Sequence, residues 1–490
     1  MKRVEQVRIT FKNEDRVICV AKGTTLLEAQ ARAGLQPDAP CAGRGTCGKC
    51  KVLMNSEEVL ACQTTVDRDA IVELPRAHQE QILTGGISAQ AQPDGAHRYA
   101  LAFDIGTTTV VAYLMNGETG ELLSQASMRN PQTQYGADVI SRIQMAMEGG
   151  ADELASCIRS ALGELTRQAA RNAGIDPGEI ALASIVGNTA MHHLLLGIDP
   201  SPLTKPPYMP KVAEALELPA AELLPIASNG TVRVLPNIAG FVGADTVGCL
   251  LSTRFDRLEE LTLMIDIGTN GELALGDHRS RLACSTAAGP AFEGARISCG
   301  MRGADGAVDH VWMEDGQLRW HVIGEGDAAG LCGSGLLDLV AVLLENGTID
   351  ETGKLLCGDA YQLGDTVITL TQKDVREVQL AKAAIRAGVE LMAEKLGVRV
   401  DHIRRVLLAG AFGNFMNPAS ACRIGMIPPC LLDRIESIGN AAGEGAKLCA
   451  VSEGEFEYSK RLASGTEFLE LASLPQFQDC YVDALSFEEE

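Results

Sequence analysis

The feature that most constrains the fold is a short motif that occurs twice. An apolar strand ends in Asp and is followed by a turn of Gly and Thr, in FDIGTTT at residues 103–109 and in IDIGTNG at residues 265–271. After each turn the apolar pattern resumes, in YALAFDIGTTTVVAYLMNGETGELL from residue 99 and in ELTLMIDIGTNGELALGDHRSRL from residue 260. Alternating apolar runs and helices are typical of α/β proteins. The repeat therefore predicts two structurally related α/β lobes.

The residues of the two turns suit a phosphate chain. Glycine lets backbone N–H groups approach a phosphate, and Thr or Asn adds a further donor. Asp at a strand end can hold Mg²⁺ through water, because Mg²⁺ gives up its hydration shell reluctantly. One such turn is a weak indication, but two at matched places predict a facing pair that clamps the phosphates of one nucleotide. The alternative is a pair of packing turns in an α/β protein that binds no nucleotide.

Two glycine-rich segments follow nearer the C-terminus. RVLLAGAFGNFMNP at residues 405–418 predicts a third strand that ends in a glycine turn. IGNAAGEGAKL at residues 438–448 predicts a helix that starts with small residues, which would allow close helix packing between the lobes. Amphipathic helices are predicted at 151–174 and 376–397.

A cysteine-rich loop near the N-terminus, CAGRGTCGKC at residues 41–50, partly matches the phosphate-binding loop G-x-x-x-x-G-K-[ST]. The match fails on mechanism, because Cys50 replaces the hydroxyl that should reach Mg²⁺. The chain also continues as a short alternating apolar run, which predicts a strand where that loop needs a helix.

Four cysteines have the spacing C-x5-C-x2-C-x11-C, and they are Cys41, Cys47, Cys50 and Cys62. Glycines in the loop let the backbone wrap closely and point N–H groups at the sulfurs, which suits an iron–sulfur cluster. The alternative is zinc held by four thiolates, although zinc ribbons usually present two C-x2-C knuckles and this spacing has one. The spacing resembles that of [2Fe–2S] ferredoxins, with one more residue in the first gap than plant-type proteins and a much shorter final gap.

The elements around this loop predict a β-grasp domain: two strands, a helix with a Thr cap, and further short strands. The segment after it carries Gly, Ser, Gln and Pro without a consistent period, which predicts a linker. The expected organisation is a [2Fe–2S] ferredoxin-like domain at 1–76, a linker at 77–98, a first nucleotide-binding lobe at 99–256, and a second lobe with C-terminal connecting helices at 257–490.

Composition excludes several classes of function. The chain of 490 residues has 42 Lys and Arg against 64 Asp and Glu, a net charge of −22, which argues against nucleic acid as a main partner. No stretch reaches the roughly 18 apolar residues of a membrane span, and the N-terminus lacks the apolar region of a secretory signal. Most of the 15 cysteines are isolated in apolar segments, as expected of reduced core residues in a cytosolic protein.

The glycine and aspartate segments resemble the phosphate-1, phosphate-2, adenosine and connecting motifs of the superfamily of sugar kinases, actin and heat-shock ATPases. That resemblance implies ATP and Mg²⁺ between two lobes, with Asp104 and Asp266 as catalytic residues near Mg²⁺. It places six residues on the phosphates: Gly106, Thr107, Thr108, Gly268, Thr269 and Asn270. It also places Gly410, Gly413 and Asn414 beside the adenosine. Spacing alone singles out no catalytic base for hydrolysis.

The whole chain resembles the reductive activators of corrinoid enzymes. Besides the cysteine loop, the resemblance rests on NPQTQYGADVISRI from residue 130, VGNTAMHHLLLGIDP from residue 186, GFVGADTVGCLL from residue 240 and GLCGSGLLDLV from residue 330. The family implies one-electron reduction of a stalled Co(II) corrinoid to Co(I), with a corrinoid protein of a methyltransferase system as partner. It further implies a low-potential electron donor (a ferredoxin, flavodoxin or reductase), allows for a homodimer, and places the protein in an anaerobic cytoplasm.

Three other functions remain open at this point: an ATP-driven electron donor of the radical-dehydratase-activator type, a redox-sensing small-molecule kinase, and a non-enzymatic regulator. Several residues have both a functional and a structural interpretation, either as contacts to partner, metal or nucleotide or as packing and capping groups. They are Arg129, Asn130, Arg142, His192, His193, Asp245 and Cys332.

Overall fold

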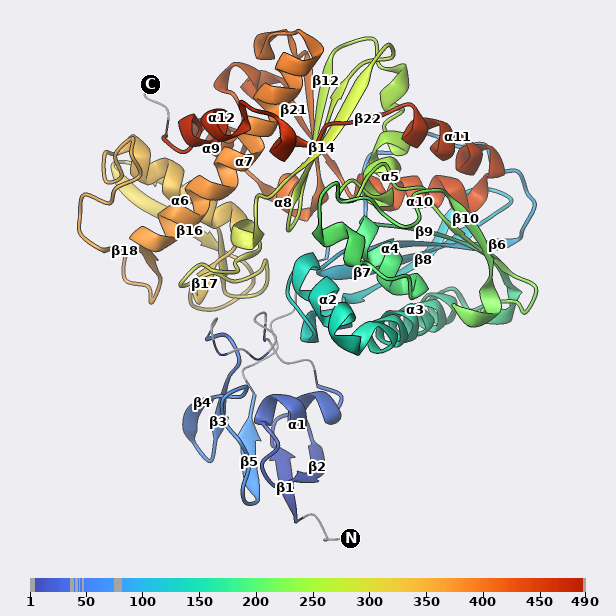
Figure 1. Ribbon diagram of the computed structural model, residues 1–490. Coiled ribbons are helices and arrows are strands. Elements are labelled where there is room, and N and C mark those ends of the chain that lie inside the picture. Colours follow the sequence, from blue (N-terminus) through green and yellow to red (C-terminus); the bar gives the residue numbers. More distant parts are fainter. Residues whose placement is uncertain are drawn as a thin grey trace.

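The computed structural model describes residues 5–35, 39, 43, 45, 48–74 and 82–487 (Figure 1). A small N-terminal sheet domain lies beside a larger body, and that body contains two lobes, each built around one large sheet. None of the helices in these residues is long and apolar enough to cross a membrane.

The N-terminal domain is a mixed sheet of five strands with one helix packed on it. Its strands are β1 (Gln6–Phe11), β2 (Arg16–Ala21), β3 (Lys51–Met54), β4 (Glu57–Leu60) and β5 (Ala70–Glu73). They lie in the order β2-β1-β5-β3-β4, with β1 antiparallel to β2 and parallel to β5. Helix α1 (Leu26–Arg32) begins after Thr25, whose hydroxyl accepts a hydrogen bond from the N–H of Glu28. This arrangement confirms the predicted β-grasp fold.

The first lobe is a mixed sheet of six strands with the order β10-β11-β9-β6-β7-β8. The strands are β6 (Tyr99–Ile105), β7 (Thr109–Asn116), β8 (Leu122–Arg129), β9 (Ile180–Gly187), β10 (Leu216–Pro219) and β11 (Thr231–Val234). One face is covered by α2 (Val139–Met145), α3 (Ala151–Ala173) and α4 (Thr189–Leu196), and the long α3 packs on β7 and β8. The apolar residues of α3 and of the strands form one buried core.

The second lobe repeats this plan in the order β21-β20-β12-β13-β14-β22. The strands are β12 (Thr262–Ile267), β13 (Gly271–Gly276), β14 (Arg281–Thr286), β20 (Arg405–Ala409), β21 (Ile435–Gly439) and β22 (Glu467–Phe468). Strand β12 lies between a parallel and an antiparallel neighbour, as β6 does in the first lobe. The two D-I-G-T turns therefore occupy equivalent places, which confirms the duplication predicted from the sequence.

The remaining elements complete the second lobe. Its helices are α6 (Gly333–Glu345), α7 (Gln372–Leu396), α8 (Gly410–Phe415), α9 (Pro418–Arg423) and α12 (Phe477–Asp483). Two smaller sheets are formed by β15 (Ala307–Glu314), β16 (Gln317–Val322) and β17 (Gly330–Leu331), and by β18 (Ala360–Gln362) and β19 (Thr369–Thr371). Helix α7 packs on β13 and β14.

Small residues join the lobes where α5 (Ala244–Ser252) crosses α10 (Ala441–Val451), which is followed by α11 (Glu453–Ser464). A Cβ at Gly445 would overlap the backbone of Gly248, and a Cβ at Gly248 would lie 2.8 Å from the carbonyl oxygen of Ala442. The helices approach closely only because these side chains are absent. The close packing predicted for residues 438–448 is thus confirmed.

Residues 82–98, the described part of the predicted linker, are hydrogen-bonded to the larger body. The N–H of Asn440 donates to Gly85 O at 3.0 Å, that of Ala89 to Ser252 O at 2.7 Å, and that of Asp94 to Val451 O at 3.1 Å. We call residues 82–98 the strap. The strap is therefore anchored at the ends of β21, α5 and α10, between the two lobes.

The N-terminal domain contacts the second lobe through Lys49. Its ammonium group donates to Gly300 O at 2.7 Å and lies 3.4 Å from Ile297 O. Lys49 directly precedes Cys50, so the domain meets the body at the cysteine-rich end.

Candidate functional site

A cavity of about 330 Å³ opens between the two lobes, within the range of small-ligand sites. Nine of the predicted nucleotide-site residues line it: Asp104, Gly106, Thr107, Thr108, Asp266, Gly268, Thr269, Asn270 and Gly410. The strap contributes Ile82 and Leu83 to the lining of the same cavity. The fold thus brings the strap, the two D-I-G-T turns and Gly410 to one cavity.

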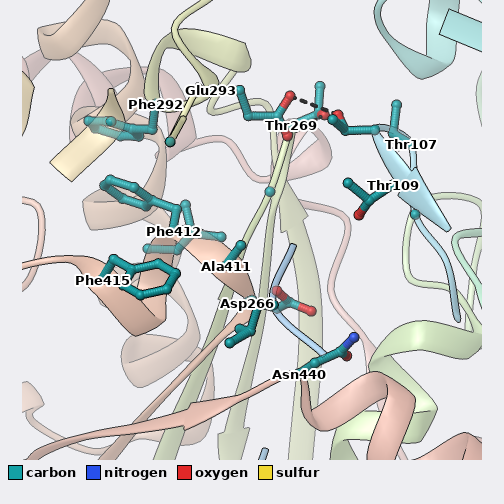
Figure 2. A pocket seen from close by; sticks show the side chains of 18 of the residues that line it. Thr107, Thr109, Asp266, Thr269, Phe292, Glu293, Ala411, Phe412, Phe415 and Asn440 are labelled. Atoms are coloured by element: carbon teal, nitrogen blue, oxygen red, sulfur yellow. Dashed lines mark hydrogen bonds between the residues drawn. The ribbon is translucent and has the colours of Figure 1, made fainter. Parts of the chain in front are cut away.

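The two D-I-G-T turns face each other across this cavity, and one carboxylate joins them. Glu293 accepts a hydrogen bond from the hydroxyl of Thr108 at 3.1 Å and another from the hydroxyl of Thr269 at 3.0 Å. Figure 2 shows Glu293 and Thr269 on one side of the cavity and Asp266 and Asn440 on the other. Sequence reasoning did not single out Glu293, because its segment GPAFEG has glycines but no strand that would place it at the site.

Buried polar side chains hold the first turn in shape. The amide of Asn130 donates to Gly106 O at 2.8 Å, and the guanidinium of Arg142 donates to Thr107 O at 2.5 Å. The Asn188 amide donates to the Thr107 hydroxyl at 3.0 Å. Asn130 and Arg142 are fully buried. Of the two interpretations kept for them, the structure supports the structural one, in which they position the turn.

Four carboxyl groups in the lining of the cavity lie close enough to act on one another: Asp104, Asp245, Asp266 and Glu272. The pKa of Asp104 is raised to about 6, mainly because the carboxyl group is withdrawn from bulk water. The hydrogen bond that the Asn440 amide donates to it at 2.8 Å acts in the opposite direction, and the charge of Asp266 adds to the rise. Withdrawal from water also raises the pKa of Asp266 to about 6. For Asp245 and Glu272, desolvation and neighbouring carboxylates act in the same upward direction on the pKa.

This acidic group suits a divalent cation, whose charge would reverse these upward pKa shifts. Within the described ranges, no three acidic, His or Cys side chains converge closely enough to form a complete metal cage. Mg²⁺ needs no such cage, since it commonly takes one or two carboxylates and completes its shell with water and substrate phosphates. Asp245 lies in the first turn of α5, where its carboxylate accepts a hydrogen bond from the N–H of Thr246 at 2.7 Å, and it also lines the cavity, so both interpretations kept for it stay open.

Aromatic rings form the wall opposite the first turn (Figure 2). Phe292 and Phe412 stack with their ring centroids 4.6 Å apart, and the exposed Phe415 lies beside them. Gly410 has a φ of +81°, and a Cβ there would lie 2.5 Å from Asp266 Oδ1. Glycine is therefore required at this position.

Gly413 and Asn414, which the resemblance placed beside the adenosine, are not among the described residues that line the cavity. Gly413 is buried at the contact of α8 with β20, where its carbonyl accepts a hydrogen bond from the Ser437 hydroxyl. On α8, the residues that reach the cavity are Gly410, Ala411, Phe412 and Phe415.

Two of the four predicted cluster ligands, Cys50 and Cys62, are described, and both are buried in the N-terminal core. Cys41 and Cys47 lie outside the described residues. Gly43, Gly45 and Gly48 have φ between +67° and +79°, as a tightly curved loop requires. A Cβ at Gly45 would lie 2.7 Å from the amide nitrogen of Gln63, and one at Gly43 would lie 3.8 Å from Cys62 Cβ. This close backbone approach fits a loop wrapped around a cluster.

Three of the remaining ambiguous residues, His192, His193 and Cys332, favour a structural interpretation. His193 Nδ1 lies 2.7 Å from Thr189 O, and its Nε2 accepts from the Lys211 N–H at 3.1 Å. His192 is buried beside Asn237, and burial lowers its pKa to about 4. Cys332 lines the cavity, but burial raises the pKa of its thiol, which favours the neutral packing group over a reactive thiolate.

Comparison with known protein families assigns all three parts of the chain. Residues 9–74 match the 2Fe–2S iron–sulfur cluster binding domain, residues 99–258 the RACo middle region, and residues 260–490 the C-terminal domain of RACo, its ASKHA domain. The corrinoid activation enzyme RamQ of Eubacterium limosum is 39% identical over 414 residues, which cover 78% of this chain and 69% of RamQ. The chain belongs to the RACo family of reductive corrinoid activators.

Two further relatives agree with this assignment. The [Co(II) methylated amine-specific corrinoid protein] reductase of Methanosarcina barkeri is 27% identical over 79% of this chain and 77% of its own. A solved structure of a reductive activator for corrinoid, iron–sulfur protein superimposes with a TM-score of 0.72 at 29% identity, covering 98% of both chains. The RACo-family assignment confirms the predicted combination of a [2Fe–2S] ferredoxin domain with a domain of the superfamily of sugar kinases, actin and heat-shock ATPases, abbreviated ASKHA.

Proposed function

We propose that this protein is an ATP-dependent reductive activator that returns the Co(II) of a corrinoid protein to Co(I). The observation that carries the proposal is that the two D-I-G-T turns, the acidic group and the strap, which follows the ferredoxin domain in the chain, converge on one cavity. The names of RamQ and of the corrinoid protein reductase support the corrinoid as the substrate.

The residues of the cavity have distinct roles in this proposal. The glycines and threonines of the two turns bind the ATP phosphates through backbone N–H and hydroxyl groups. Asp104 and Asp266 hold the waters of Mg²⁺, and Asn440 fixes the carboxylate of Asp104 by its hydrogen bond. Ala411, Phe412 and Phe415 of α8 provide an apolar surface for the adenine ring.

Cys41, Cys47, Cys50 and Cys62 are proposed as the ligands of the [2Fe–2S] cluster, which supplies a single electron at low potential when bound. Moving one electron uphill by 100 mV costs about 2.3 kcal/mol, so the energy of nucleotide hydrolysis can overcome a gap of a few hundred millivolts. The protein's own contribution is to couple closure of the two lobes to this transfer.

Several finer assignments belong to the same proposal. The electron donor is a low-potential ferredoxin, flavodoxin or reductase, the protein acts in an anaerobic cytoplasm, and a homodimer is compatible with the family. The functional units are residues 1–76, 99–256 and 257–490. Of the segment 77–98, the strap 82–98 is fastened to the body by hydrogen bonds, so we place any pivot of the ferredoxin domain before residue 85.

The test is anoxic visible spectroscopy of a Co(II) corrinoid protein mixed with the activator and a low-potential reductant, with and without Mg·ATP. We expect the Co(I) band only with Mg·ATP, and no band with the Asp104→Asn variant. Formation of Co(I) without ATP contradicts the proposal. Failure to form Co(I), while the cluster and the ATPase activity are intact, would point to another electron acceptor.

A further inference from the structure

Glu293 is the one described carboxylate that accepts hydrogen bonds from both phosphate-binding turns. It lies across the cavity from Asp266 (Figure 2). The inference below rests on the proposed binding of ATP in this cavity.

The backbone that carries Glu293 is firmly held. Glu293 ends a short turn of helix, Pro290–Glu293, in which Ala291 and Phe292 are buried. The N–H of Gly294 donates back to Ala291 O at 3.0 Å, and a Cβ at Gly294 would overlap the backbone of Met301. The side chain of Glu293 therefore starts from a fixed point and extends into the space between the turns.

Bound ATP would compete for the hydrogen bonds that Glu293 accepts. A carboxylate and a phosphate are both acceptors, so they compete for the hydroxyl groups of Thr108 and Thr269. When the terminal phosphate takes these donors, the carboxylate of Glu293 loses both partners while it remains beside the phosphate. Two anions this close repel each other unless a cation or a hydrogen-bond donor lies between them, and a water molecule can donate to both.

We propose that Glu293 is the catalytic base of ATP hydrolysis. Its carboxylate accepts a proton from the bridging water as the water oxygen bonds to the terminal phosphorus. The bond between that phosphorus and the ADP oxygen breaks, with its electron pair going to ADP. The proton then passes from Glu293 to the released phosphate, so ATP and water give ADP and phosphate with Glu293 unchanged.

The other carboxylates of the cavity are engaged elsewhere. Asp104 is hydrogen-bonded to Asn440, and Asp266 contacts the thiol of Cys249 at 3.7 Å. Asp309 is hydrogen-bonded to His321 at 2.6 Å. Asp245 accepts a hydrogen bond from the N–H of Thr246 at 2.7 Å, and Glu272 accepts one from the hydroxyl of Ser285 at 3.3 Å. Within the described residues, none of these five is hydrogen-bonded to a Thr of either turn, so Glu293 is the acid best placed between them.

The test compares wild type with Glu293→Gln, which keeps the size of the side chain and removes its basicity. Hydrolysis is followed with radiolabelled ATP in a single turnover, and ATP binding by equilibrium dialysis in the presence of Mg²⁺. Loss of a general base typically slows a reaction roughly 100- to 10,000-fold. We expect a loss of this size with ATP binding unchanged or tighter, because a competing negative charge is gone. The exposed Glu118→Gln is the matched control and should hydrolyse ATP as wild type does.

Two outcomes overturn the assignment. Hydrolysis within a few-fold of wild type in Glu293→Gln would show that Glu293 only bridges the turns of the nucleotide-free protein. Loss of hydrolysis together with loss of ATP binding would make Glu293 a binding residue. If the wild type hydrolyses ATP but never yields Co(I), the proposed function fails while this test still decides the role of Glu293.

Discussion

Asp104 illustrates at the scale of one residue how a binding site is built at the expense of stability. A carboxyl group whose pKa in the folded protein is about 6, against 3.8 as its ordinary value, destabilises the fold when it is charged. Without nucleotide, Asp104→Asn should therefore raise the free energy of unfolding at pH 7.5 by about 1–3 kcal/mol. Thermal unfolding measures this gain, and equilibrium dialysis should show that the variant no longer binds Mg·ATP. A variant less stable than wild type would contradict the prediction.

The same carboxyl groups predict how nucleotide binding depends on pH. Asp104 and Asp266 have a pKa of about 6 in the nucleotide-free protein, and a bound cation lowers both, so binding releases protons near and below pH 6. Affinity for Mg·ATP should rise with pH up to about 6.5 and then level off. Titration calorimetry in two buffers of different ionisation enthalpy measures the released protons. Proton uptake on binding, or a flat affinity from pH 5 to 8, would contradict this assignment.

At the scale of elements, the crossing of α5 and α10 depends on glycines. Gly445→Ala would place a methyl group against the backbone of Gly248, so the helices must separate. We expect a loss of about 1–3 kcal/mol in the free energy of unfolding. Gly454→Ala is the matched control: it also lies in a helix, but its nearest neighbour is Ser452 Oγ at 3.6 Å. That change should be neutral or slightly stabilising, by up to about 1 kcal/mol. Denaturant unfolding of both variants checks the pair.

The strength of a local sequence signal decided which elements could be predicted. The D-I-G-T turns follow apolar strands, so both the strands and the position of Asp104 and Asp266 at their ends were predictable. Glu293 and Gly413 show the limit. Glu293 reaches the cavity through the packing of a loop, and Gly413 packs against Leu408 of β20, a tertiary contact that no local pattern encodes. Asn440 also directly follows a strand that ends in Gly439, and that signal could have identified it.

At the scale of the whole molecule, Lys49 is the described contact that joins the ferredoxin domain to the second lobe. Lys49→Met removes the ammonium group and should weaken this docked arrangement while ATP hydrolysis stays unchanged. Small-angle X-ray scattering should then show a larger radius of gyration. The control is Lys51→Met, because Lys51 pairs with Glu58 within its own domain at 2.9 Å. If both variants keep the radius of the wild type, the Lys49 contact does not hold the domains together.

The strap limits where electron transfer can take place. Because hydrogen bonds fix it from Gly85 onward, the reach of the ferredoxin domain is set by the covalent chain between Leu74 and Gly85, at most about 40 Å when fully extended. The fixed end of this chain lies next to Ile82 and Leu83, which line the cavity. Wherever the domain moves, its Leu74 end stays within that distance of the strap. A corrinoid protein must therefore bring its cobalt to this side of the activator, and a partner bound on the far side of either lobe would remain out of range.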